Sequence, residues 1–117
     1  MITFTPEQLR FCMSESVAYE EAEAYASDMA LSSAFLPEDE NAAPDEELYT
    51  ALVSLWRIFH VPFRDFLRLL EMSQTQVSKR FCIPLRTVQD WAGERRSCAP
   101  YIRLMMAEIV GILNVCS

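Results

Sequence analysis

Apolar residues recur at helical spacing along most of the chain and predict a series of short helices. The first begins after Thr5, because Thr5 and Gln8 form a capping box and Pro6 suits the first position of a helix. We expect this helix over about residues 6–32, and a break near residues 18–21 would divide it in two. Its apolar stripe consists of Leu9, Met13, Val17, Ala18, Ala22, Tyr25 and Met29.

The same spacing predicts five further helices, the first of them capped by Asp45. They are expected at about residues 46–60, 62–71, 73–81, 84–94 and 99–115. Their buried positions are expected to be Leu48, Leu52, Leu55, Phe59, Phe63, Phe66, Leu67, Leu70, Val77, Phe81, Val88 and Trp91. Only two glycines occur in 117 residues, which disfavours a fold rich in tight β-turns. We therefore predict an all-α fold, a compact helical bundle.

Charge divides the chain into an acidic and a basic half. Residues 1–50 contain twelve acidic side chains and one basic one, whereas residues 51–117 contain nine basic and five acidic ones, so the net charge of −7 conceals a positive half. Residues 37–47 contain two prolines and six acidic residues, a composition typical of a linker. The expected organisation is an acidic helical N-terminal segment at 1–36, a linker at 37–47 and a helical domain at 48–117.

Several functional classes find no support in the sequence. No apolar run approaches the roughly 18 residues of a membrane-spanning helix, and no secretory signal opens the chain, so we expect a cytoplasmic protein without membrane contact. Cys12, Cys82, Cys98 and Cys116 do not have zinc-ligand spacing, and His60 is the only histidine. We predict no metal, no cofactor and no disulfide. No catalytic residues are assigned, because one histidine allows no triad, and the protein is expected not to be an enzyme.

Residues 73–94 have the spacing of a helix-turn-helix. Ser73 can cap a short helix that ends before Ile83, and Pro84 begins a second helix after a turn of three or four residues. Spacing alone is only moderately specific, because any helical hairpin consists of two helices and a turn. The residue types carry more information than the spacing.

Ser73-Gln74, the run from Phe81 to Val88 and Trp91 resemble the lambda-repressor-like, or XRE-type, helix-turn-helix family. The relatives that the pattern suggests are small proteins of bacteria and their mobile elements, in which the third helix opens with Ile-Pro and a Pro-Tyr follows, as Pro100-Tyr101 does here. The resemblance covers about residues 62–112, while residues 1–45 lie outside it. It implies a DNA-binding domain that acts as a homodimer on a palindrome.

A recognition helix presents its outward N-terminal residues to base edges in the major groove. On a helix that buries Val88 and Trp91, the outward residues are Leu85, Arg86, Gln89 and Asp90. Arg86 can contact guanine, Gln89 adenine and Leu85 a thymine methyl. Asp90 can accept a hydrogen bond from cytosine or hold Arg86 across one helical turn.

Phosphate contacts are expected from the residues around this helix. The resemblance places Gln74 on a phosphate, and Lys79, Arg80, Arg95 and Arg96 are the expected basic contacts. Residues 73–103 contain six basic and two acidic side chains, which we count as one positive patch. The alternative to a phosphate-binding patch is an ordinary solvated face, on which Arg95 and Arg96 complement a helix dipole.

The sequence departs from the family pattern at three positions. Cys82 stands at the turn where glycine is usual, and a left-handed conformation there would cost about 1 kcal/mol or more, so a turn of different shape is expected. Ala92 replaces the usual glutamate after the tryptophan. Gly93 falls one place before the usual glycine, so the end of the recognition helix is expected to differ from the standard geometry.

Two functions remain open at this stage. The leading one is a sequence-specific DNA-binding protein, a small bacterial or mobile-element transcriptional regulator whose partner is double-stranded DNA. The alternative is a protein-interaction module, like an antitoxin or a phage inhibitor such as an anti-CRISPR, whose acidic N-terminal segment binds a basic protein. The C-terminal helix either completes the core or pairs with a second chain. Its apolar residues are Ile102, Met105, Met106, Ile109, Val110 and Leu113.

Overall fold

The fold is all-α, as the helical spacing predicts. A computed structural model describes residues 3–35 and 45–115, and within them the chain forms seven helices and two strands of two residues each. The described chain divides into two compact units, which are treated separately. The N-terminal unit comprises the described residues of Met1–Phe59 and Asn114–Ser117, and the C-terminal unit is His60–Leu113. Most of the expected linker 37–47 lies outside the described residues, and the predicted domain boundary stays a prediction.

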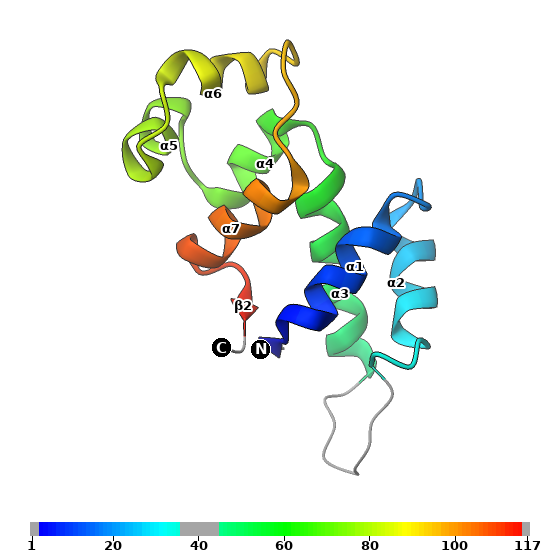
Figure 1. The fold of residues 1–117 in the computed structure, drawn as a ribbon. Helices are drawn as coiled ribbons and strands as arrows, with labels where there is room; N and C mark the ends of the chain where they lie inside the picture. Colours follow the sequence, from blue (N-terminus) through cyan, green and yellow to red (C-terminus); the bar gives the residue numbers. More distant parts are fainter. Residues whose placement is uncertain (1–2, 36–44, 116–117) are drawn as a thin grey trace. The chain divides into compact units, whose positions relative to one another are not determined.

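The N-terminal unit contains three helices and a short parallel strand pair (Figure 1). The elements are β1 (Thr3–Phe4), α1 (Pro6–Ser16), α2 (Ala22–Ala30), α3 (Asp45–His60, whose last residue the division assigns to the other unit) and β2 (Asn114–Val115). Thr3 pairs with Asn114 and Phe4 with Val115, so residues from both ends of the described chain meet in this unit.

The predicted start of α1 is confirmed. Oγ1 of Thr5 accepts from the backbone N–H of Gln8 at 3.1 Å, and Oε1 of Gln8 accepts from the N–H of Thr5 at 2.9 Å. The helix ends at Ser16 and α2 begins at Ala22, so the alternative with two shorter helices is the correct one. Glu20, Glu21 and Glu23 stand at the start of α2, where carboxylates are favoured by the helix dipole.

Polar bonds between the helices hold this unit together. The hydroxyl of Tyr25 donates to the carbonyl of Cys12 at 2.9 Å, and burial raises the pKa of the Cys12 thiol to about 11. Nε1 of Trp56 on α3 donates to the carbonyl of Tyr19 at 3.3 Å. The expected place of Val17 in the apolar stripe is wrong: this residue is 79% exposed, because α1 ends before it and the helical rotation does not continue.

The C-terminal unit consists of four helices, α4 (Phe63–Leu70), α5 (Gln74–Phe81), α6 (Leu85–Ala92) and α7 (Pro100–Val110). Helix α6 packs on both α5 and α4. In Figure 1, α5 and α6 lie at the upper end of the unit, with α4 and α7 below them. The buried apolar residues here are Phe63, Phe66, Leu67, Leu70, Val77, Val88, Trp91, Ala92, Cys98, Met106, Ala107 and Leu113. Most of these were expected, but Phe81 is only half-buried.

Left-handed residues end the helices of this unit, although glycine is scarce. Glu71 after α4 has φ 57°, Cys82 after α5 has φ 56°, and Glu94 just beyond α6 has φ 60°. Only α7 ends on a left-handed glycine, Gly111 with φ 97°. A non-glycine residue in this conformation costs about 1 kcal/mol, so the unit tolerates three such costs to keep its helices short and its turns tight.

Candidate nucleic-acid interface

Helix α5 is held at its N-terminus by a second capping box. Oγ of Ser73 accepts from the N–H of Gln76 at 3.1 Å, and Oε1 of Gln76 accepts from the N–H of Ser73 at 2.8 Å. The predicted cap at Ser73 is confirmed, and Gln76 is its partner. Because two of the unpaired N–H groups are satisfied locally, this eight-residue helix has a fixed start.

The turn between α5 and α6 is fastened by Ser78. Its carbonyl accepts from the N–H groups of Cys82 and Ile83, the second at 3.0 Å, and its hydroxyl donates to the carbonyl of Ile83 at 2.6 Å. Cys82 occupies the left-handed conformation in which the resembling family has glycine. Cys82 therefore adopts the left-handed geometry although it is not glycine, and the hydrogen bonds of Ser78 hold the turn in that geometry.

Helix α6 buries one face and exposes the other. Val88 and Trp91 are buried as expected, and the Trp91 ring meets Phe63 edge-on with a centroid distance of 5.3 Å. Leu85, Arg86 and Gln89 are exposed. The helix begins at Leu85 with Pro84 as its N-cap, one residue later than expected, and ends at Ala92. The rotation of α6 thus presents three of the four residues that were predicted to contact bases.

Asp90, the fourth of these residues, joins two arginines. Nε of Arg95 donates to Oδ1 of Asp90 at 3.0 Å, and Nε of Arg86 lies 3.5 Å from the same oxygen. The hydrogen bond from Arg95, together with the charges of Arg86, Arg95 and Arg96, lowers the pKa of the Asp90 carboxyl. The Asp90 side chain is largely covered, while that of Arg86 is 82% exposed. The sequence suggested the pair with Arg86 but not the hydrogen bond from Arg95.

The backbone after α6 explains why Arg95 reaches Asp90. Gly93 has an ordinary φ of −88°, and the left-handed residue is Glu94, the position at which the resembling family has glycine. This reversal directs the N–H groups of Arg95 and Arg96 to the carbonyl of Asp90, at 2.9 and 3.2 Å. The chain therefore folds back over Asp90. The carbonyl of Asp90 accepts from the backbone of Arg95 and Arg96, and its carboxylate accepts from the Arg95 side chain.

The residues expected to contact phosphates are placed unequally. Lys79, Arg80, Arg95 and Arg96 are exposed, whereas Gln74, at the start of α5, is half-buried. The guanidinium of Arg80 lies 5.9 Å from the centre of the neighbouring Phe81 ring. Nothing in the structure tests the predicted contacts themselves, which stay predictions.

Arg103 is one of the six basic residues that the sequence assigns to the positive patch, but its expected place on the surface is wrong. Its side chain is on the buried side of α7 and donates from Nη1 to the carbonyl of Val61. Its guanidinium lies 5.8 and 5.5 Å from the ring centres of Phe63 and Phe66. Burial lowers the pKa of Arg103, and burial also raises the pKa of the nearby Cys98 thiol to about 11. This cation supports the core and adds nothing to the surface.

Two further arginines, Arg64 and Arg68, which the sequence analysis did not name, line a hollow at the C-terminal end of α6. Arg64 on α4 donates from Nε to the carbonyl of Ala92 at 3.1 Å, at the C-terminal end of α6. Arg68 is exposed one turn later and lies 3.3 Å from Asp65. A polar hollow joins them to the end of α6, lined by Pro62, Arg64, Asp65, Arg68, Ala92, Gly93 and Glu94. The four-residue spacing of Arg64 and Arg68, between buried positions of α4, is the sequence feature that could have indicated that both side chains face outward.

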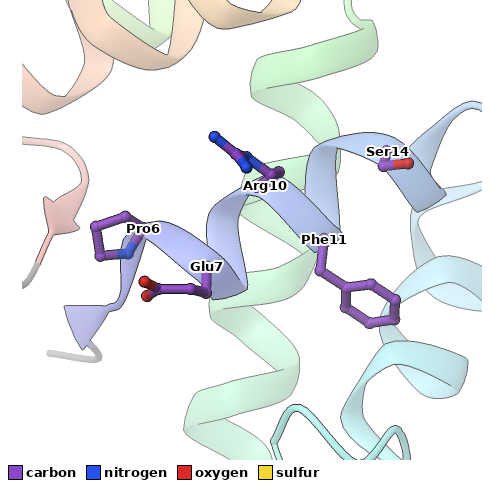
Figure 2. A pocket seen from close by; sticks show the side chains of 5 residues that line it. All are labelled: Pro6, Glu7, Arg10, Phe11 and Ser14. Carbon is purple, nitrogen blue, oxygen red and sulfur yellow. The ribbon is translucent and has the colours of Figure 1, made fainter.

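The N-terminal unit has a hollow of its own on α1 (Figure 2). Its lining consists of Pro6, Glu7, Arg10, Phe11 and Ser14, which all come from this one helix. All five residues are exposed, so they bring no buried polar group to the hollow.

The described residues also show what other chemistry is at hand. Among residues 3–35 and 45–115, no three His, Cys, Asp or Glu side chains stand close enough together to hold a metal ion. The cysteines of this part of the chain, Cys12, Cys82 and Cys98, are free thiols. None of its helices has the length and apolarity needed to cross a membrane. Comparison with known proteins found no matching family model, no matching curated sequence and no matching solved structure.

Proposed function

We propose that this chain is a sequence-specific DNA-binding protein, a small transcriptional regulator that places α6 in the major groove. One observation carries the proposal: α6 buries Val88 and Trp91 and thereby holds Leu85, Arg86 and Gln89 on its exposed face, near its N-terminus. An α-helix fits the major groove and reads bases from its N-terminal residues.

Each outward residue has a chemical role in this proposal. Arg86 donates two hydrogen bonds to a guanine, Gln89 pairs with an adenine, and Leu85 packs on a thymine methyl group. Asp90 takes the second of the two roles that its position allows, because Arg86 and Arg95 already occupy its carboxylate. It orients Arg86 towards the groove and does not itself read a base.

The exposed cations around α6 supply the affinity that does not depend on sequence. Lys79, Arg80, Arg95 and Arg96 stand on both sides of the recognition helix in the chain and are exposed. If all four neutralise phosphates, the logarithm of the binding constant should fall with the logarithm of salt concentration at a slope of about −3.6. An ordinary solvated face would show no such slope.

The experiment is a selection from random duplex DNA followed by titration. The purified full-length chain is incubated with a randomised duplex pool, and enriched sequences are compared with scrambled duplexes by fluorescence anisotropy at several salt concentrations. We expect enriched sequences to bind at least about a thousandfold more tightly than scrambled ones at physiological salt. No enrichment, together with no binding to any duplex at low salt, would overturn the proposal.

A protein-interaction module is the second candidate, and one observation favours it. At the turn between α1 and α2 the exposed carboxylates of Glu15, Glu20 and Glu21 stand close in the chain to the exposed Val17. A surface that combines carboxylates with an exposed apolar group suits a basic partner protein. This function would be supported instead if the chain bound no DNA but bound a basic protein, and if changing the three glutamates to glutamine abolished that binding.

A further inference from the structure

The side chain of Arg95 is fastened across the C-terminal end of α6. Its Nε donates to Oδ1 of Asp90 at 3.0 Å, and its backbone N–H donates to the Asp90 carbonyl at 2.9 Å. A Cβ atom on Gly93 would lie 3.5 Å from Cζ and 3.6 Å from Nη2 of Arg95, so the guanidinium passes close against the helix end. Backbone and side chain thus both hold Arg95 to Asp90. The Nε of Arg95 has to leave this carboxylate before it can meet a DNA phosphate.

Arg86 shares the carboxylate oxygen to which Arg95 donates. Nε of Arg86 lies 3.5 Å from Oδ1 of Asp90, which is longer than the roughly 2.7–3.2 Å of an ordinary N–H···O hydrogen bond. The Asp90 side chain is 14% exposed, whereas that of Arg86 is 82% exposed, so the carboxylate is confined and the Arg86 guanidinium can turn. Charge attraction across one helical turn therefore orients Arg86 without binding it tightly, and its Nη groups stay available for a guanine.

Asp90 could also withdraw Arg86 from the DNA. An arginine binds a carboxylate through two parallel N–H donors, and it binds the edge of a guanine in the same way. Without Arg95, the hydrogen bond to Oδ1 of Asp90 would fall to Arg86, which lies four residues earlier on the same side of α6. The carboxylate and the guanine compete for the same donors, so this capture would lower the preference of Arg86 for guanine. By donating to Oδ1, Arg95 prevents the capture.

We propose that Arg95 is a positioning residue for base recognition, which engages Asp90 and so leaves Arg86 available to read a guanine. The inference rests on the proposed function, and it gives Arg95 a role other than the expected phosphate contact. Arg96, the next residue in the chain, is exposed and keeps the phosphate role. The two neighbouring arginines therefore differ: one acts on sequence preference through Asp90, and the other acts on affinity for any duplex.

The first test uses the full-length chain without DNA. Exchange of the Arg86 Nε–H with water is followed by ¹⁵N NMR, and its signal is assigned from the spectrum of Arg86→Lys. In Arg95→Ala this exchange should slow several-fold, because the hydrogen bond to Asp90 passes to Arg86. Arg96→Ala is the matched control, since it removes an exposed arginine one position further on, and it should leave the exchange unchanged. An exchange rate of Arg86 that Arg95→Ala does not lower would overturn the proposal.

The second test measures base discrimination. Anisotropy titrations compare a selected duplex with one in which the guanine is replaced at the position where Arg86→Ala loses its preference. Arg95→Ala should reduce the ratio of the two affinities about two- to fivefold, the range expected of an ion pair with an exposed partner, whereas Arg96→Ala should leave this ratio unchanged. Adding Asp90→Asn to Arg95→Ala should restore the ratio, because a neutral amide no longer attracts Arg86.

The rescue separates positioning from a structural role. A second substitution at Asp90 would not repair a helix end that Arg95→Ala had unfolded, and melting temperatures check that every variant is folded. Equal losses on both duplexes in Arg95→Ala would make Arg95 a phosphate contact and overturn the proposal, and so would a double variant whose ratio stays as low as that of Arg95→Ala. If the wild-type chain binds no duplex, the proposed function itself fails, and a slowed Arg86 exchange in Arg95→Ala would still show that the two arginines compete for Asp90.

Discussion

Helices α6 and α7 belong to one unit, but α6 exposes its arginine whereas α7 buries its own. Arg86 on α6 has a side chain that is 82% exposed, whereas Arg103 on α7 is 8% exposed and donates to the carbonyl of Val61. The exposed face of α6 is mostly polar, through Arg86 and Gln89. The large exposed side chains of α7 are mostly apolar: Tyr101, Met105 and Ile109 are exposed, beside the carboxylate of Glu108. An arginine therefore lies on the outside of α6 and on the buried side of α7.

The difference teaches that helical rotation follows packing and not charge. In α6 the bulky Trp91 and Val88 fit the space beside α4 and α5, so polar residues are left outside. In α7 the inner position is taken by Arg103, because its guanidinium lies against the Phe63 and Phe66 rings and reaches a backbone acceptor. Met105 and Ile109, on the other side of α7, are left exposed.

The largest expected effect comes from the inner face of α6. Trp91→Ala removes a buried ring that packs edge-on against Phe63 and should lower the free energy of unfolding by about 3–5 kcal/mol. Gln89→Ala on the outer face should change it by less than about 0.5 kcal/mol. Urea unfolding followed by circular dichroism measures both. A Trp91→Ala chain as stable as the wild type would mean that α6 is rotated differently.

The same substitution at the two arginines sharpens the comparison. Arg103→Met keeps an aliphatic chain beside the Phe63 ring but leaves the carbonyl of Val61 without this donor, at a cost of about 1–3 kcal/mol of unfolding free energy. Arg86→Met should cost less than about 0.5 kcal/mol, because the side chain is exposed. Thermal and urea melts of the two variants provide the measurement. Equal costs would erase the distinction between the inner and the outer arginine.

Arg86 and Arg96 are both exposed, so replacing either should change the free energy of unfolding little. We expect the two replacements to differ in their effect on DNA affinity. Arg86→Ala should weaken binding to a selected sequence by about 1–3 kcal/mol and relax the preference at one base pair. Arg96→Ala is the matched phosphate variant, chosen because Arg95 is already engaged by Asp90, and it should weaken all duplexes alike and reduce the salt slope by about 1. Anisotropy titrations on selected and scrambled duplexes compare the two. Identical losses on both duplexes for Arg86→Ala would remove it from base reading.

The smallest effect concerns the carboxylate between the arginines. Because the pKa of Asp90 in the fold lies below its ordinary value of 3.8, the ionised form is favoured by folding. Its contribution to stability is present above pH 3.8 and is lost as the pH falls through the lower value in the fold. The melting temperatures of wild type and Asp90→Asn should therefore differ at neutral pH and converge in acid. Arg95→Met should show the same convergence, and a difference that persists in acid would mean that Asp90 acts through something other than its charge.

Much of the C-terminal unit could be anticipated from single residues. Ser73 caps α5, Pro84 precedes α6, and Val88 and Trp91 are buried, because capping chemistry and apolar spacing act over one or two helical turns. The exposure of Leu85, Arg86 and Gln89 follows from the same spacing. In the N-terminal unit, the capping box of Thr5 was equally readable, but the place of Val17 was not, because nothing local distinguishes a continuous helix from one that ends at Ser16.

The sequence by itself determined where α1, α5 and α6 begin, to within one residue, which side of α6 faces outward, and that basic residues flank this helix in the chain, since these features depend on neighbours a few residues apart. Only the tertiary structure decided that Arg103 is buried, that Arg64 meets the end of α6 and that Arg95 returns to Asp90. The first two contacts join residues 42 and 28 positions apart, and the third depends on a left-handed backbone at Glu94, where glycine would be expected. Such contacts form where packing brings hydrogen-bond acceptors and aromatic rings close to a cation. The spacing of apolar residues along the chain does not predict which acceptor or ring a given cation will meet.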